Sequence, residues 1–196
     1  MVIENTSRIM ESTTDVLLMQ QLSGGDDLAL NELMSRWREP VAGFLLRMVG
    51  DHATAIDLTQ ETFVRLYTSR GGYKPTAAFS TFLFHIATNV ARSHARWIGR
   101  HPTVPLEDSE GRLVHEPVET QLPPDDAAEL HEEMIAVNKA IATLPADQRE
   151  ALLLFAVEGM SHAEVAKALG CSSKAVEVRI YRARQTLKKS LGNEES

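Results

Sequence analysis

Residues 161–191 read SHAEVAKALGCSSKAVEVRIYRARQTLKKSL, and this stretch decides the fold of the C-terminal part of the chain. Ser161 and Glu164 have the spacing of a capping box, in which two side chains satisfy unpaired amides at a helix start. Gly170 ends the short helix, and the serines after Cys171 can cap a second, longer one. A short capped helix, a tight turn and a long basic helix form the helix-turn-helix pattern.

The long helix, expected from about Lys174 to Leu191, divides into two faces. Apolar residues recur at steps of three and four and predict its buried face, which comprises Val176, Ile180, Ala183, Leu187 and Leu191. The opposite face is polar and basic. Because a helix fits the major groove, we expect early residues of this face to reach base edges.

Each side chain on that polar face suggests a contact. Arg182 can bond guanine or a phosphate, and Glu177 can accept from the amino group of cytosine. Val178 or Tyr181 can touch a thymine methyl group. Cations farther round the helix suit backbone phosphates: Arg179, Arg184, Lys188 and Lys189. A basic helix that faces only solvent in a helical bundle is the alternative explanation.

Helical periodicity also fills the first hundred residues. It predicts helices over 28–48, 55–67 and 79–97, and Pro40 should kink or split the first of them. The glycines and proline of residues 70–75 indicate a loop. Since no stretch shows the alternation of β-branched residues that strands require, we predict an all-α protein.

A proline-containing acidic segment separates two helical parts. Five prolines lie among acids and polar residues within 98–126, which predicts an extended, mobile linker. Helical signal resumes near Ala127. The predicted organisation is a flexible N-terminus (1–14), a helical domain (15–97), the linker (98–126), a second helical domain (127–191) and a tail (192–196).

The formal net charge of −7 disfavours a polyanion such as DNA as a partner, but the charge is distributed in blocks. Residues 62–106 hold six basic side chains and no acid, whereas residues 107–133 carry a net charge of −9. Residues 134–191 carry +4. Such blocks indicate separate binding surfaces.

Aromatic residues interleave with the cations of the basic block. Stacking groups beside cations suit single-stranded or distorted nucleic acid, although Phe79 and Phe82 also fit a protein core. Asn89 stands in mid-helix, a position that asparagine disfavours unless it has a specific partner. A plain surface asparagine is the alternative.

Several other classes of protein are disfavoured. The single cysteine excludes an intramolecular disulfide, and no apolar run approaches the roughly 18 residues of a membrane span. We find no Gly-rich phosphate loop, no HExxH motif and no metal-spaced ligand cluster, so we expect no enzyme, no cofactor and no metal. The N-terminus does not resemble a secretion signal, and we expect a soluble cytoplasmic protein.

Five stretches, in order along the chain, resemble bacterial sigma factors of the extracytoplasmic-function (ECF) group. They are DLTQETF (57–63), FSTFLFHIATN (79–89), LPADQR (144–149), EGMSHAEVA (158–166) and KAVEVRIYRAR (174–184). The resemblance covers about 15–97 and 127–191. It implies a non-enzymatic subunit that gives RNA polymerase its promoter specificity.

The resemblance also implies partners and site residues. The first domain would dock on the polymerase clamp helices and melt the −10 element; the second would sit by the flap and read the −35 element. Core polymerase would contact Asp57, Gln60 and Glu61. The 69–78 loop, with Tyr73 and Lys74, and Asn89 would hold an extruded −10 base, while Arg92 and Arg96 would hold the strand backbone. The −35 element would face Ser173, Lys174, Glu177, Val178, Tyr181 and Arg182. An anti-sigma factor is a further implied partner.

Three positions depart from the family pattern. Phe82 stands where tryptophan is frequent, and Ser93 where an acid is common. Glu177 replaces a common basic residue at a base-reading position, and an acid cannot donate to guanine. A helix-turn-helix regulator that acts without polymerase is the alternative function, but it leaves the basic 62–106 block and the 57–63 motif unexplained.

Overall fold

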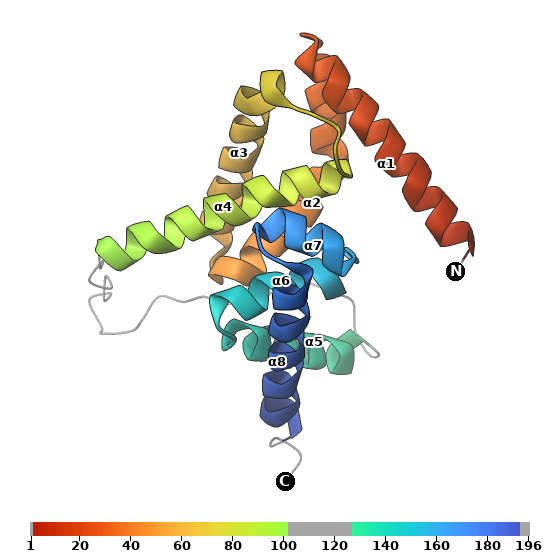
Figure 1. The fold of residues 1–196 in the computed structure, drawn as a ribbon. Helices are drawn as coiled ribbons and strands as arrows, with labels where there is room; N and C mark the ends of the chain where they lie inside the picture. Colours follow the sequence, from red (N-terminus) through yellow and green to blue (C-terminus); the bar gives the residue numbers. More distant parts are fainter. Residues whose placement is uncertain (1, 102–126, 193–196) are drawn as a thin grey trace.

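The computed structural model describes residues 2–101 and 127–192, and each regular element within these ranges is helical (Figure 1). The first half contains α1 (Val2–Ser23), α2 (Leu28–Val49), α3 (His52–Ser69), the 3-10 turn η1 (Arg70–Gly72) and α4 (Phe79–Arg100). The second half contains α5 (Ala127–Ala142), α6 (Ala146–Ala156), α7 (His162–Leu169) and α8 (Ser173–Gly192). The predicted all-α class is confirmed.

Some helix boundaries differ from those that the periodicity predicts. Pro40 was expected to kink or split its helix. It does not split it, and α2 runs through Pro40 as one helix. Proline removes one donor from the helix ladder, and the buried side chains of Val41 and Phe44 keep the next turn packed. α4 continues to Arg100, and α1 begins at Val2, where the pattern indicated no element. Most of the predicted linker, 102–126, lies outside the described residues.

Aromatic rings organise the core of the first half. Trp37 meets Phe79 and Phe84 edge-on, with ring centroids 5.9 and 6.2 Å apart, and Phe84 meets Phe44 at 5.4 Å. Edge-to-face pairs of this kind add to the stabilisation from apolar burial. The indole N–H of Trp37 donates to the buried Asp15 carboxylate at 3.0 Å. These contacts join α1, α2 and α4.

The core of the second half follows the predicted helical stripe. Val176, Ile180 and Ala183 of α8 are buried, while Leu187 is partly buried against the same cluster. Leu153 and Leu154 of α6 and Val165 of α7 are buried beside them. The stripe fixes which face of α8 remains outside.

The turn of the helix-turn-helix has the predicted caps. The amide of Glu164 donates to the Ser161 hydroxyl at 3.3 Å, and the amide of Ser161 donates back to the Glu164 carboxylate at 2.8 Å. Gly170 ends α7 in the left-handed region with φ of 67°, which favours glycine. The amide of Ala175 donates to the Ser172 hydroxyl at 3.2 Å at the start of α8.

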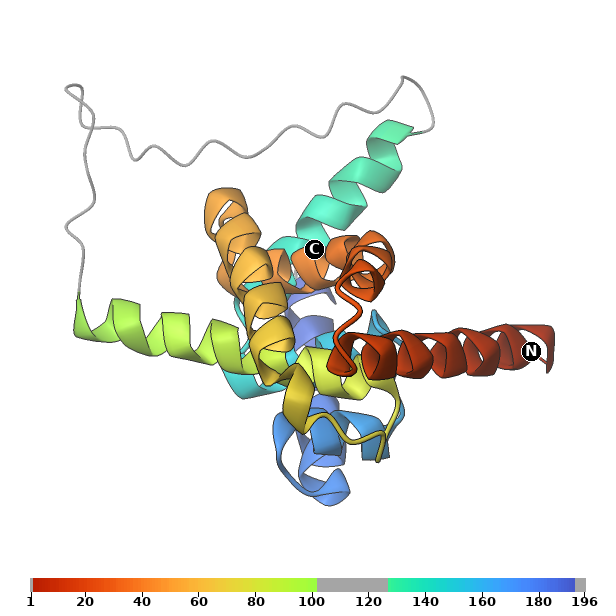
Figure 2. The ribbon, with the colours of Figure 1, turned by 90° about the horizontal axis from the view of Figure 1, so that it is seen from above.

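The two halves pack against each other, with α7 and α6 lying along α4 and α2 (Figure 1). A guanidinium N–H of Arg149 donates to the Met48 carbonyl at 2.8 Å, and the Lys167 ammonium donates to the Thr76 carbonyl at 2.7 Å. The buried residues of both halves form one continuous cluster. The C-terminal end of α4 and the N-terminal part of α1 project from this body in opposite directions (Figure 2).

We predict that Ser161→Ala lowers the free energy of unfolding by about 1 kcal/mol, because the N-cap of α7 loses its hydroxyl acceptor. Urea denaturation measures the change. Ser35→Ala, at an exposed position inside α2, is the control and should cause no loss. Equal midpoints for Ser161→Ala and the unchanged protein would contradict the role of the cap.

Candidate nucleic-acid interface

The outer face of α8 presents the residues that the sequence assigned to base reading. All of them are exposed: Ser173, Lys174, Glu177, Val178, Tyr181 and Arg182. The Tyr181 side chain is 65% exposed. No core contact explains a large aromatic ring that is this open to solvent. The helix therefore offers polar, charged and aromatic groups together on one surface, which is the combination that major-groove readout uses.

Glu177 is anchored within this face by its neighbour. The Lys174 ammonium donates to the Glu177 carboxylate at 2.9 Å. That hydrogen bond lowers the pKa of Glu177, so the carboxylate is charged and accepts hydrogen bonds only. Position 177 therefore favours a partner that offers a hydrogen-bond donor.

Two arginines of α8 contact the protein itself. Arg179 lies 3.3 Å from the Asp147 carboxylate and donates to the Cys171 sulfur at 3.6 Å, which leaves its side chain 26% exposed. Arg184 is exposed and lies over the Phe155 ring at 5.4 Å. The structure thus groups Arg184 with the open surface but turns Arg179 toward α6.

A second candidate surface is formed by α4 and the loop before it. Tyr73 packs on Phe82, with ring centroids 5.1 Å apart, and burial raises the pKa of its phenol. Its buried hydroxyl has no hydrogen-bond partner among the described residues. Lys74 beside it is exposed. The loop therefore presents one cation next to a half-buried aromatic ring.

The polar side chains of α4 differ in how open they are. Arg96 is exposed and donates to the Ser93 hydroxyl at 3.0 Å. Asn89 is half-buried and makes a 3.1 Å hydrogen bond with His85. Arg92 forms an ion pair with Glu150 of α6, and this hydrogen bond raises the pKa of the guanidinium. All three of these α4 side chains thus have a partner within the protein, but only Arg92 pairs with the second half of the chain.

Sequence reasoning placed His85 on the polar face of α4 but missed Glu150 as a part of the surface. Glu150 lies three and four positions before the buried Leu153 and Leu154, on the same face of α6. A carboxylate on an apolar face needs a buried partner, and that was a signal in the sequence. The identity of the partner was not, because Arg92 lies in the other half of the chain.

A polar stripe on α3 holds the residues assigned to polymerase contact. Asp57 and Gln60 are exposed, and Glu61 is half-exposed in an ion pair with Arg65 at 2.6 Å. Their spacing of three and four places them on one face of the helix, whereas Leu58 beside them is buried. The face is acidic and unobstructed.

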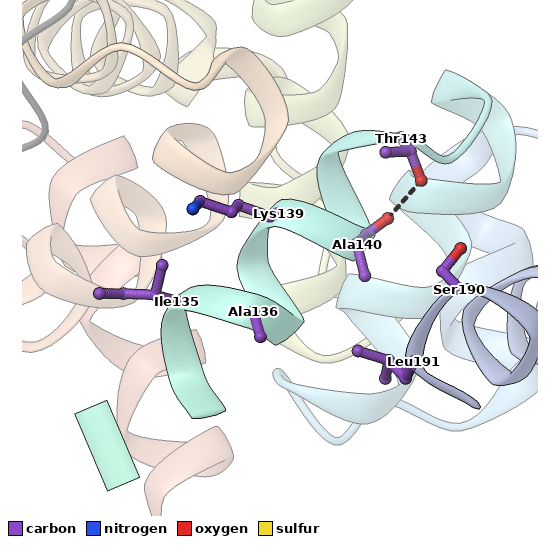
Figure 3. A pocket seen from close by; sticks show the side chains of 7 residues that line it. All are labelled: Ile135, Ala136, Lys139, Ala140, Thr143, Ser190 and Leu191. Carbon is purple, nitrogen blue, oxygen red and sulfur yellow. Dashed lines mark hydrogen bonds between the residues drawn. The ribbon is translucent and has the colours of Figure 1, made fainter. Parts of the chain in front are cut away.

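A hollow of about 420 Å³ lies between α5 and α8 (Figure 3). Its lining mixes alkyl groups with Lys139, Thr143 and Ser190, and the Thr143 hydroxyl donates to the Ala140 carbonyl at 2.7 Å. The part of the chain that the structure describes contains no group of three His, Cys, Asp or Glu placed to hold a metal. None of its helices has the length and apolar composition that crossing a bilayer requires.

Comparison with known proteins matches both halves to one family. The family model described as Sigma-70 region 2 matches residues 33–100, and Sigma-70, region 4 matches 134–187. RNA polymerase sigma-H factor of Pseudomonas aeruginosa is 33% identical over 184 residues, which cover 90% of this chain and 93% of that protein. ECF RNA polymerase sigma-E factor of Haemophilus influenzae is 32% identical, covering 92% and 97%.

The chain belongs to the ECF group of sigma factors. As a sigma factor it is a non-catalytic initiation factor that confers promoter specificity on bacterial RNA polymerase. The region 2 match also accounts for the basic 62–106 block and the 57–63 motif, which a stand-alone helix-turn-helix regulator leaves unexplained.

Solved structures of similar proteins share this fold. The structure of CnrH in complex with the cytosolic domain of CnrY has a TM-score of 0.67 and 27% identity, and covers 93% of this sigma factor and 99% of that chain. The sigma factor RpoE, in complex with the anti-sigma factor NepR from Bartonella quintana, has a TM-score of 0.65 and 25% identity. The match covers 83% of this chain and 96% of the RpoE chain.

The stability of this sigma factor should depend on the protonation of Glu158, in the turn between α6 and α7. Burial raises the pKa of Glu158 from its ordinary 4.5 to about 7, while the charge of Arg47 opposes the shift. The folded protein thus keeps a proton up to about pH 7 that the unfolded chain releases near pH 4.5. Raising the pH across this window therefore lowers the free energy of unfolding, and this decrease is complete above about pH 7.

Glu158→Gln should remove this contribution. Urea denaturation of both proteins between pH 4.5 and 8 gives a difference curve that changes across the window and is flat above it. Glu39→Gln, at an exposed position on α2, is the control and should not alter the curve. Parallel curves for Glu158→Gln and the unchanged protein would contradict the raised pKa.

Proposed function

We propose that this sigma factor melts and holds the −10 element with α4 and the 69–78 loop, and reads the −35 element with α8. Core polymerase docks on α3 through its clamp helices and on the second domain through its flap. The observation that carries the proposal is the division of the family matches between two DNA-suited helices, α4 and α8. The proposed docking face of α3 carries two acids, Asp57 and Glu61.

For the −10 element, the strand must leave the duplex before its pairing edges are accessible. Asn89 offers an amide that donates and accepts, while Tyr73 and Lys74 border the same loop. Arg92 and Arg96 follow along α4 and suit successive phosphates of the strand. The half-buried aromatic ring of Tyr73 supports base stacking at this position.

For the −35 element, α8 enters the major groove with its exposed face. Arg182 donates to guanine, and the charged Glu177 accepts from cytosine. Val178 and Tyr181 contact thymine methyl groups, while Ser173, Lys174 and Arg184 position the helix on the backbone. The acidic Glu177 supports a −35 sequence preference that differs from that of family members with a basic residue at this position.

The proposed partners and location follow from this role. Core RNA polymerase and promoter DNA place the protein in the cytoplasm. One of the similar structures contains the anti-sigma factor NepR, and we propose that an anti-sigma protein also binds this chain. The exposed acidic face of Asp57, Gln60 and Glu61 supports a contact with polymerase.

Arg182→Ala should weaken promoter binding of the holoenzyme by about 1–3 kcal/mol, because a bidentate contact to guanine is lost. Electrophoretic mobility shift of a promoter that the holoenzyme transcribes measures this loss. Arg38→Ala, which removes an exposed arginine from α2, is the control and should bind as the unchanged protein does. Full affinity in Arg182→Ala would remove its base-reading role.

Asp57→Arg should abolish stable association with core polymerase, because a charge reversal at an exposed docking face is repulsive. Co-purification with tagged core enzyme measures the association, and circular dichroism checks that the variant remains folded. Asp27→Arg makes the same charge change at an exposed site outside α3 and should co-purify normally. If Asp57→Arg also co-purified in full, the docking assignment would fail.

A further inference from the structure

We propose that Arg92 and Glu150 form an intramolecular latch that holds the free sigma factor in a closed state, with its second domain covering the −10 strand surface. The proposal rests on the function proposed above, because Arg92 and Asn89 are the residues assigned to that strand. It adds a form of regulation that needs no second protein.

The latch is a two-point contact. The Arg92 Nε–H donates to Glu150 Oε1 at 2.9 Å, and Nη2–H donates to Oε2 at 2.6 Å. This parallel arrangement is the strong, orientation-specific form of the arginine–carboxylate pair. The Glu150 side chain is 3% exposed and that of Arg92 is 31% exposed, so the carboxylate lies in a largely water-excluded site that the guanidinium closes. Its strength therefore depends on the two domains staying together.

The charge distribution of the chain explains why this partner is needed. Residues 62–106 contain no acid, so no carboxylate near in sequence can neutralise Arg92. Glu150 supplies the missing charge from 58 positions away. In the closed state Glu150 requires Arg92, since a buried charge without a partner is costly. In the open state water solvates both.

The C-terminal end of α7 completes the closed surface. The Ala168 carbonyl, an acceptor with no partner farther along the helix, lies 2.8 Å from Nδ1 of His85. Because a carbonyl only accepts, Nδ1 carries the proton, and Nε2 then accepts from the Asn89 amide at 3.1 Å. The Leu169 carbonyl lies 3.5 Å from Nη1 of Arg92. The negative end of α7 thus faces α4, a helix that carries three arginines and no acid.

Closure and strand binding exclude each other. Arg92 cannot hold a phosphate while it bonds Glu150. Asn89 bonds His85, whose other ring nitrogen bonds the Ala168 carbonyl in the closed state. The Lys167 contact with the Thr76 carbonyl occupies the 69–78 loop in the same state. On α8, by contrast, Tyr181 and Arg182 remain exposed. The closed state hides one DNA surface and leaves the other open.

Two measurements on the full-length protein without polymerase test the latch. Small-angle X-ray scattering gives the radius of gyration, and fluorescence anisotropy gives the affinity for fluorescein-labelled dT12, a single strand that binds cations without base readout. Glu150→Gln removes the charge of the latch and keeps the shape of the side chain. Glu32→Gln removes an equal charge from an exposed pair with Arg36 and is the matched control.

Glu150→Gln should enlarge the radius of gyration and tighten dT12 binding about tenfold, as expected when a state closed nine-tenths of the time is opened. Glu32→Gln should change neither. The double exchange Arg92→Glu with Glu150→Arg should restore the compact dimensions, because it rebuilds the pair with its charges reversed.

An unchanged radius of gyration in Glu150→Gln, with or without a lower melting temperature, overturns the latch and leaves Glu150 a structural residue. An enlarged radius of gyration with unchanged dT12 affinity would support the latch, because the variant has opened. It would contradict the strand-binding role of Arg92. The two proposals therefore fail in different measurements.

Discussion

A carboxylate buried on an apolar helix face constrains much of this structure. Glu150 lies on the face of α6 that also buries Leu153 and Leu154, and the guanidinium of Arg92 is its partner. Such a pair contributes little net stability compared with apolar side chains, but breaking it leaves an uncompensated charge. It therefore defines which surfaces of the two halves meet, rather than how strongly each half folds.

The uneven charge of the chain also determines which groups pack against the basic block. An average of −7 conceals a 45-residue stretch with six cations and no acid. A surface of that kind binds an anion of some sort in every state that it adopts. In the described structure the anionic groups come from the protein itself, through Glu150 and the carbonyl end of α7. We propose that the phosphates of promoter DNA take that place in a transcription complex.

Local features were predictable from the sequence because their causes lie within a few residues. The capping box at Ser161 and the buried stripe of Val176 and Ile180 follow from spacing alone, and both occur as expected. The exposed face of α8, to which we assign base reading, is the complement of that stripe. Asn89, for which a specific partner and a plain surface position were both open, bonds His85 one helical turn away.

Contacts between distant residues were not predictable. Nothing near Arg179 indicates that it turns toward Asp147, and nothing near Arg92 indicates Glu150, because each pairing depends on how whole helices pack. The continuation of α2 through Pro40 has the same origin, since packing outweighs a single lost hydrogen bond. Thus the sequence indicated which face of each helix is polar, but not which polar residues contact another helix.

As a sigma factor, this chain should direct core RNA polymerase to a particular class of promoters. Run-off transcription with purified core polymerase and this protein, on a genomic fragment library, tests this role directly. Transcripts should appear only when the protein is added and should start downstream of one shared two-part motif, with elements near −10 and −35. Protein-dependent binding to duplex DNA without any new transcript would contradict it.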